Sequence, residues 1–276
     1  MLGGEGNDKF EQFIGHGLNE LNIEGGAGND KVSGGAGFYD VEVDVGDDDD
    51  IVYGFDGVYG QEVNLGYGED VFFGGNGGTD LTVYGGYGND NIFGPNDNSI
   101  NSGEVKLYGE AGNDLIDFGD HNYGHYGYGG DGNDKIIGGI VTNMQSLEGN
   151  DGDDKIWMIN PEQRGMEGSP TYGNYGYGGY GNDHIYGSDL GEFLVGDAGT
   201  LFNGDLVYGA APYADYYNES GEGDDVIFGY GGDDTIFGMA GDDVLDGGLG
   251  ADNVVGGRGN DKLFGQEGDD FMYGDE

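Results

Sequence analysis

Aspartate recurs at fixed intervals along this chain, always close to glycines, in a pattern that could bind metal ions. From residue 220 the sequence repeats every nine residues as G-G-x-G-[ND]-D-x-φ-x, where φ is a large apolar residue. Copies of the same turn occur upstream, starting at residue 3 and recurring about every 20 residues. The aspartates at the sixth position of these turns are Asp8, Asp30, Asp50, Asp70, Asp90, Asp114, Asp134, Asp154, Asp183, Asp225, Asp234, Asp243, Asp252, Asp261 and Asp270.

The ligands that these turns offer are oxygens, which favours calcium. Calcium takes roughly 6–8 oxygens from carboxylates and backbone carbonyls, and consecutive glycines can turn their carbonyls toward one centre because they tolerate positive φ. A solvated acidic loop would need no fixed register, whereas ligation does. We therefore expect the fifteen sixth-position aspartates to bind multiple calcium ions, with Asp40 and Asp80 as further candidates at less regular turns.

Softer metals lack suitable ligands in this chain. It contains no Cys and four His, and a structural zinc site needs four Cys or His ligands in tetrahedral geometry. His121 and His125 are four residues apart, but Gly124 lies between them and no helix is indicated there. We interpret these histidines as loop residues.

Short strands must position the turns. The eighth position of the repeat is always apolar, and short alternating runs such as Leu21-Asn22-Ile23 precede the spaced turns. Such runs are typical of strands of a few residues, and no window supports a helix of ordinary length. A coil of two short strands and two turns explains both periods if the Gly-Asp turn occupies one side upstream and both sides downstream. Stacked coils would then bring oxygens from neighbouring turns to one ion.

The spacing divides the chain into three parts. Residues 1–186 are expected to form a solenoid with coils of about 20 residues and calcium turns mainly on one side. Residues 187–219 are expected to be an irregular insertion or a degenerate coil, and residues 220–276 a regular nonapeptide roll. The 42-residue step to residue 220 is interpreted as about two coils. We expect about 14 coils stacked about 4.8 Å apart.

The nonapeptide, in six uninterrupted copies from residue 220 to residue 273, resembles the RTX (repeats-in-toxin, haemolysin-type calcium-binding) family. With the spaced turns, the resemblance covers nearly the whole chain. It implies an all-β fold, a right-handed parallel β-roll or β-solenoid of short strands with calcium bound in its Gly-Asp turns. It also implies a secreted, extracellular or cell-surface protein that is exported unfolded by a type I system. Family members usually carry a secretion signal after the repeats, whereas this sequence ends inside a repeat.

Composition narrows the function classes. The 276 residues include 67 Gly, 55 Asp and Glu and only 8 Lys and Arg, which gives a formal net charge of −47. Nucleic-acid binders and proteins that bind anionic membranes need basic patches, so both classes are excluded. No apolar stretch is long enough for a transmembrane helix. So many carboxylates repel one another, and we expect the chain to be disordered without metal and to fold on calcium.

Aromatic side chains and open ends suggest contacts between copies. Position nine points outward and is often aromatic, so these residues either gain partial cover from neighbouring strands or form an adhesive face; the Tyr-rich runs 121–130 and 172–181 would suit the second purpose. A solenoid that lacks caps exposes apolar cross-sections and strand edges at its ends. We expect a homo-oligomer in which the rolls stack end to end into a filament or surface layer.

Two other function classes are to be compared with a structural role. The chain could be the calcium-binding repeat domain of a larger secreted toxin, hydrolase or adhesin, which a longer parent sequence would reveal. An enzyme is disfavoured, because neither the zinc-binding HExxH helix nor a G-x-S-x-G nucleophile motif occurs. We therefore expect no catalytic residues and no cofactor other than calcium.

Overall fold

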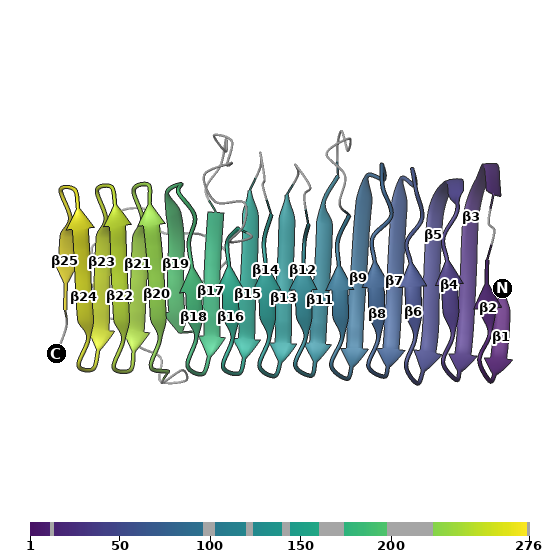
Figure 1. Cartoon of the computed structure of the whole chain (residues 1–276), viewed down its shortest axis with the longest axis horizontal. Helices are drawn as coiled ribbons and strands as arrows, with labels where there is room; N and C mark the ends of the chain where they lie inside the picture. The colour runs from purple at the N-terminus through teal and green to yellow at the C-terminus, as the bar shows by residue number, and fades with distance from the viewer. Residues whose placement is uncertain are drawn as a thin grey trace.

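Two parallel β-sheets run side by side along the long axis of the molecule (Figure 1). The computed structural model describes residues 1–11, 14–95, 103–119, 124–139, 144–159, 174–197 and 223–274. The first sheet contains β1 (Leu2–Glu5), β3 (Ile14–Ala27), β5 (Ala36–Asp47), β7 (Gly60–Tyr67), β9 (Asp80–Tyr87), β11 (Val105–Ala111), β13 (His125–Asp131), β15 (Gln145–Asp151), β17 (Asn174–Tyr180), β19 (Glu192–Asp197), β21 (Thr235–Ala240), β23 (Asn253–Arg258) and β25 (Phe271–Tyr273). The second sheet contains β2 (Lys9–Phe10), β4 (Lys31–Ser33), β6 (Ile51–Tyr53), β8 (Val71–Phe73), β10 (Asn91–Phe93), β12 (Leu115–Asp117), β14 (Lys135–Ile137), β16 (Lys155–Trp157), β18 (His184–Tyr186), β20 (Val226–Gly231), β22 (Val244–Leu249) and β24 (Lys262–Glu267).

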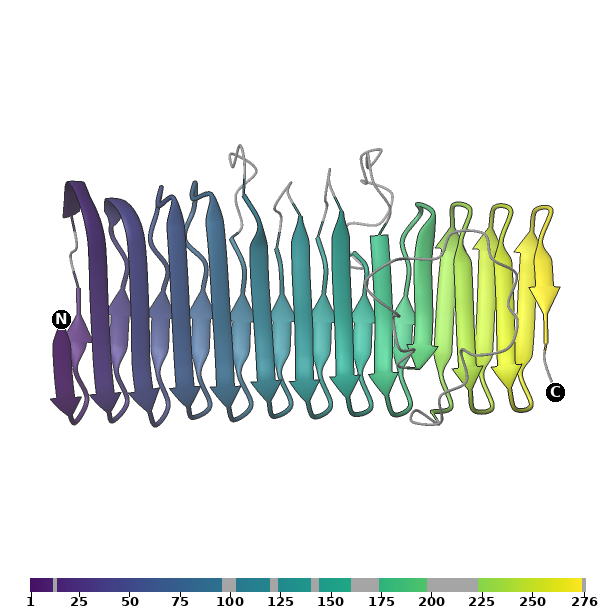
Figure 2. The same cartoon turned by 180° about the vertical axis from the view of Figure 1, so that it is seen from behind.

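The chain alternates between the sheets, so each coil contributes one strand to each of them. In the first sheet β11 pairs in parallel with β9 and β13, and in the second β12 pairs in parallel with β10 and β14. This winding places the two termini at opposite ends of the long axis (Figures 1 and 2). None of the described segments is a helix of the length and apolar character that a membrane crossing requires. The predicted all-β fold and parallel β-roll are confirmed.

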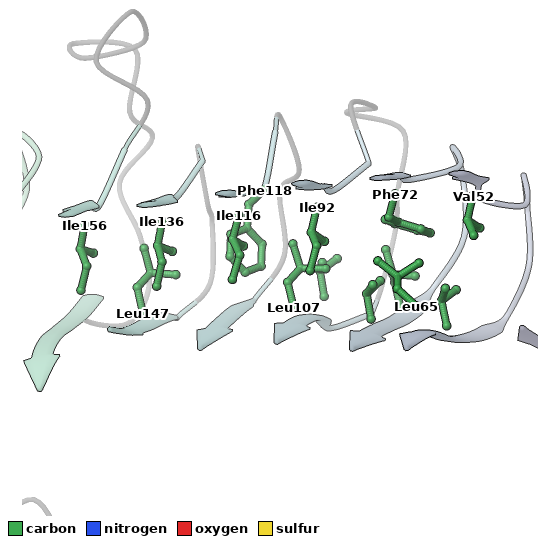
Figure 3. Close-up of a cluster of buried hydrophobic side chains, with 14 of the residues drawn as sticks. Val52, Leu65, Phe72, Ile92, Leu107, Ile116, Phe118, Ile136, Leu147 and Ile156 are labelled. Carbon is green, nitrogen blue, oxygen red and sulfur yellow. The ribbon is translucent and has the colours of Figure 1, made fainter. Parts of the chain in front are cut away.

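A single layer of side chains fills the space between the sheets (Figure 3). The eighth-position residues that follow the long series of turns point inward from the second sheet, and alternate residues of the first sheet, such as Leu65 and Leu107, point toward them. In the C-terminal coils Ile236 and Val254 occupy the eighth position on strands of the first sheet. Period-two alternation explains this arrangement, because successive side chains of a strand face opposite sides. The fully buried eighth-position residues are Val32, Val52, Phe72, Ile92, Ile116, Ile136, Ile156, Ile185, Ile227, Ile236, Leu245 and Val254.

The 42-residue step between Asp183 and Asp225 is a single coil, so its interpretation as about two coils is wrong. Strand β18 pairs directly with β20, and the backbone N–H of Asp183 donates a hydrogen bond to Asp225. Residues 198–222, which account for the extra length, lie outside the described part of the chain. Within the described residues the second sheet has twelve strands, fewer than the 14 coils expected. Strand β19 lies within the range 187–219; the three-part division of the chain stays a prediction.

Tyr and Gly alternate in the Tyr-rich runs, which fits a strand whose inward face has little room for side chains. In β13, Tyr126 and Tyr128 point outward while Gly127 faces the core. A β-carbon at Gly127 would lie 2.8 Å from the ring of Phe118 and 3.0 Å from Leu147. Glycine is therefore required where large side chains from the same coil and from the next one fill the interior. Residues 121–123 and 172–173 of these runs lie outside the described residues.

The outward aromatic residues stack on one another from coil to coil. Tyr108 stacks between Tyr84 and Tyr128 in the first sheet, with ring centroids 5.1 and 4.9 Å apart. In the second sheet Phe73 stacks between Tyr53 and Phe93, at 5.2 Å from each. Parallel in-register strands impose this spacing, since equivalent residues lie about 4.8 Å apart. Neighbouring strands thus give these rings partial cover.

Candidate metal centre

The sixth-position aspartates form two straight rows, one along each edge of the roll. The turns that lead from the first sheet to the second lie along the lower edge in Figure 1 and contain the long row. The turns that lead back contain the short row, which is confined to the C-terminal coils. The long row consists of Asp8, Asp30, Asp50, Asp70, Asp90, Asp114, Asp134, Asp154, Asp183, Asp225, Asp243 and Asp261; the short row consists of Asp234, Asp252 and Asp270.

In every row aspartate after Asp8, one carboxylate oxygen accepts a hydrogen bond from the coil before. The backbone N–H of Asp90 donates to Oδ1 of Asp114 at 2.7 Å, and that of Asp114 donates to Oδ1 of Asp134 at 2.8 Å. The same bond links every successive pair of the long row and of the short row. Because each bond spans two coils, the row holds neighbouring turns in register.

The second carboxylate oxygen is buried and has no protein donor in most of these residues. Leaving a buried acceptor without a partner costs a few kcal/mol, and more if it is charged. A systematic repetition of this unfavourable feature indicates that a group outside the chain satisfies it. The unpartnered atoms are Oδ2 of Asp30, Asp50, Asp70, Asp90, Asp114, Asp134, Asp154, Asp183, Asp225, Asp234, Asp243 and Asp252.

For most of these oxygens a backbone carbonyl also lies close to the first glycine of the turn. A β-carbon at Gly85 would lie 2.6 Å from Oδ2 of Asp90 and 2.6 Å from the carbonyl oxygen of Gly109 in the next coil. Both atoms are acceptors, so no hydrogen bond can form between them. A glycine at position one leaves room for this convergence. Carboxylate and carbonyl oxygens meeting from adjacent coils are what calcium requires, so the residues present fit calcium.

Two turns of the long row depart from this pattern. Val45 and Leu65 occupy position one in the turns that end at Asp50 and Asp70, and both side chains are fully buried in the core. Oδ2 of each aspartate is nevertheless buried without a partner. These two carboxylates therefore lie beside an aliphatic side chain rather than an open glycine.

Burial raises the pKa of several row carboxyls. It raises the pKa of Asp90 to about 6, that of Asp134 to about 7 and that of Asp225 to about 9. The donated backbone hydrogen bond lowers the pKa of Asp134, whereas the charge of Asp154, its neighbour in the row, raises it. Carboxyls whose pKa is raised this far favour either a proton or a cation beside them.

The ligand set has to include the backbone. Among the described residues no three His, Cys, Asp or Glu side chains gather tightly enough to hold an ion by themselves. Asp40 and Asp80 are exposed and join neither row; Oδ1 of Asp80 accepts the N–H of Glu104 at 3.1 Å. His125 is a buried core residue whose Nδ1 lies 3.2 Å from Oε1 of Gln145, not a loop residue as interpreted from the sequence. His121 lies outside the described residues.

Sequence reasoning missed the role of position five. The backbone N–H of Asn133 donates to Oδ1 of Asn113 at 2.8 Å, and that of Asp153 donates to Oδ1 of Asn133 at 2.8 Å. This ladder runs in the opposite direction to the sixth-position ladder, from each coil back to the one before. The restriction of position five mostly to Asn or Asp was the available signal, because both offer an acceptor at Oδ1.

The fold and its turns define a class of protein, a parallel β-roll with oxygen-lined turns built for calcium. A family profile described as RTX calcium-binding nonapeptide repeat (4 copies) matches residues 22–38, 82–99, 101–122, 128–140, 171–199, 219–254 and 246–276, more than half of the chain. The chain therefore belongs to the RTX calcium-binding repeat family. RTX nonapeptide repeats bind multiple calcium ions, and a roll of such repeats is a structural domain that is not catalytic by itself. No curated protein matches the chain.

Proposed function

We propose that this protein is an extracellular structural element that calcium folds, with the ions held by the fifteen sixth-position aspartates of the two rows. The buried, unpartnered Oδ2 atoms carry this proposal. Bound calcium supplies positive charge at each pair of facing acceptors and so joins one coil to the next. The aspartates supply carboxylate oxygens and the residues at position one supply carbonyl oxygens. The hydrogen bonds to the sixth-position aspartates hold neighbouring turns in register.

Under this proposal, the calcium concentration inside or outside the cell determines whether the chain folds. Without cations, the net charge of −47 and the facing acceptors oppose folding. Extracellular calcium modules bind at roughly 10⁻⁴–10⁻³ M, well above cytosolic calcium. The chain would stay unfolded inside the cell and fold outside it, which agrees with a secreted or cell-surface protein.

A calcium titration followed by far-ultraviolet circular dichroism tests calcium-dependent folding. We expect a coil spectrum in chelator, strand signal that appears between about 0.1 and 10 mM calcium, and complete reversal on chelation. Magnesium at the same concentrations serves as the control, because it demands octahedral geometry and keeps its water shell. Equal strand content in chelator and in calcium would contradict the proposal.

End-to-end stacking of rolls into a filament or surface layer is the second part of the proposal. The last coil supports it, because Met272 of β25 is 50% exposed, while its inward-facing partner Val254 of β23 is fully buried. A further coil, from another copy or from flanking sequence of a larger secreted protein, would cover this surface. Light scattering with negative-stain microscopy separates the two. Rods that lengthen with calcium support stacking, and a folded monomer at saturating calcium favours the repeat domain of a larger toxin, hydrolase or adhesin.

A further inference from the structure

The turn between β18 and β19 has the length and position of a calcium turn but contains no sixth-position aspartate. It runs from Gly187 to Glu192, six residues, as Gly229 to Asp234 does in the next turn of the same edge. The backbone N–H of Glu192 donates to Oδ1 of Asp234 at 2.7 Å, the bond that links successive aspartates within each row. Glu192 therefore occupies the sixth position and precedes Asp234 in the short row.

The carboxylate of Glu192 takes the place that an aspartate carboxylate takes elsewhere. A β-carbon at Gly187 would lie 2.8 Å from Oε2 of Glu192 and would also meet the carbonyl oxygen of Gly229 in the next coil. This is the pairing of carboxylate and carbonyl seen beside Gly85 in the long row. Glu192 is 4% exposed, and Oδ2 of the adjoining Asp234 is buried without a partner.

Ser188 orients this carboxylate without neutralising it. Its hydroxyl donates to Oε1 of Glu192 and its backbone N–H donates to Oε2 at 3.1 Å. The side chain of Asn174 also forms a hydrogen bond with this carboxylate. An ionised carboxylate has about four acceptor positions, so these three bonds leave capacity for a metal ion. The longer glutamate side chain is thus fixed in one position, as the backbone fixes the aspartates.

At another turn on the same edge of the roll, a side-chain amide occupies the place of the Glu192 carboxylate. Gln145 lies in the column of Glu192, two strands away through Asn174. Its Oε1 and the carbonyl oxygen of Met158 approach Gly138 in the same way, but its Nε2 donates to that carbonyl at 2.6 Å. The amide donates a hydrogen bond to the carbonyl, which an ionised carboxylate cannot do. At Glu192 the side chain in this column is a carboxylate instead of an amide. It cannot donate to the carbonyl of Gly229, so the two acceptors require a cation.

We propose that Glu192 is a calcium ligand, together with the carbonyl oxygen of Gly229, and that the turn 187–192 forms the first ion site of the short row. The inference rests on the proposed calcium function of the rows. It extends the short row one coil toward the N-terminus, to the point where the neutral side chains of Asn174 and Gln145 take over the edge.

Counting ions per chain by native mass spectrometry at fixed, near-saturating calcium tests this site. Glu192→Gln is expected to bind one ion fewer than the parent, because its amide can donate to the carbonyl of Gly229. Asp189→Asn is the matched control: it removes the same charge from an exposed residue of the same turn and is expected to leave the count unchanged. Gln145→Glu, the reverse exchange, is expected to add one ion.

The outcomes separate this site from the general proposal. A parent chain that binds no calcium overturns the proposed function of the rows. A parent that binds several ions, with an equal count in Glu192→Gln and in Gln145→Glu, overturns the site at Glu192 alone. Circular dichroism of each variant at saturating calcium confirms that the compared chains are folded, and the added ion in Gln145→Glu decides the matter if Glu192→Gln does not fold.

Discussion

The two oxygens of a buried row aspartate have separate tasks. Oδ1 accepts a backbone hydrogen bond from the preceding coil, as Asp154 does from Asp134 at 2.7 Å. Oδ2 faces a carbonyl oxygen and has no donor within the described protein. The protein satisfies the first oxygen and leaves the second for a cation. An aspartate in this position therefore contributes more to stability when calcium is present.

Neutralising one row aspartate tests this division. Asp154→Asn is expected to bind one ion fewer and to lower the free energy of unfolding at saturating calcium by about 2 kcal/mol. An ion present at 100 times its dissociation constant contributes about 2.7 kcal/mol, and the new amide hydrogen bond to the facing carbonyl offsets about 1 kcal/mol of this. Urea denaturation with and without added calcium measures the effect.

The neighbouring residue provides the control. Asp153→Asn removes the same charge one position earlier, at an exposed site where Asn133 and Asn182 occupy the equivalent positions in adjacent coils. Its Oδ1 still accepts the hydrogen bond from Asn182, so ion count and stability should stay within about 0.5 kcal/mol of the parent. Equal losses in the two variants would show that general charge, not ligation, governs stability.

Glycine at position one should be as necessary as the aspartate. In Gly229→Ala the new β-carbon would meet Oδ2 of Asp234 and lie 2.5 Å from the carbonyl oxygen of Gly247, so the carboxylate must leave its place. We expect a loss of about 1–3 kcal/mol at saturating calcium, from overpacking and a weakened ion site. Val45 and Leu65 are natural examples of a filled position one, and their turns should hold the weakest ions of the long row.

Gly231→Ala, in the same turn, is the matched variant for Gly229→Ala. Its β-carbon would meet nothing closer than 3.6 Å, an ordinary contact. Both changes reduce the entropy of the unfolded chain equally, so this term cancels. Urea midpoints at saturating calcium should separate the two variants; coinciding midpoints would mean that the space beside Gly229 has no role.

At the scale of the element, most turns are joined to their neighbours by two side-chain ladders of opposite direction. Position six accepts from the coil before, and position five accepts from the coil after, as Asn133 does from Asp153. The position-five ladder needs no metal, since its donor and acceptor are both supplied by the protein. It therefore aligns the turns independently of the ions.

Removing one acceptor of the position-five ladder tests its contribution. Asn133→Ala is expected to lower the free energy of unfolding by about 0.5–1 kcal/mol without changing the ion count, since an exposed N–H can turn to water. Asn133→Asp keeps the acceptor and should restore most of the loss. Thermal denaturation in saturating calcium measures both. A changed ion count in Asn133→Ala would contradict the separation of the two ladders.

The Gly-Asp turns and their strands could be predicted from the sequence because each is encoded locally. Position six, position eight and the alternation of β13 follow from spacing and residue type alone. Glu192 was missed because it is not aspartate, although Gly178, Gly187 and Gly196 already show the nine-residue period that continues from residue 220. The pairing of β18 with β20 across residues 198–222 is a long-range contact that no local pattern encodes.

At the scale of the whole molecule, the rows make the calcium-free fold depend on pH. Burial raises the pKa of Asp134 from its usual 3.8 to about 7 and that of Asp225 to about 9. Between the usual pKa of 3.8 and the raised pKa of each group, the folded state binds more protons than the unfolded state. The stability of the folded state therefore falls as the pH rises through this range. Below pH 4 both states are protonated and the penalty vanishes.

Metal-stripped protein should therefore contain more strand at pH 5 than at pH 8, because protons replace the missing cations. Circular dichroism from pH 5 to pH 9 measures this at low protein concentration, since the isoelectric point of about 4.1 favours precipitation in more acidic buffers. Calcium affinity should change in the opposite direction and weaken in acid, because ligation requires the ionised carboxylate. Strand content that is independent of pH in the metal-stripped chain would contradict the raised pKa values.

An anomalous difference map from a crystal grown in calcium tests the central claim most directly. The account predicts a line of peaks along each edge of the roll, each about 2.3–2.6 Å from Oδ2 of a row aspartate and within reach of a carbonyl oxygen of the adjacent coil. A folded roll without peaks along the rows, with water molecules bound to the Oδ2 atoms, would contradict it.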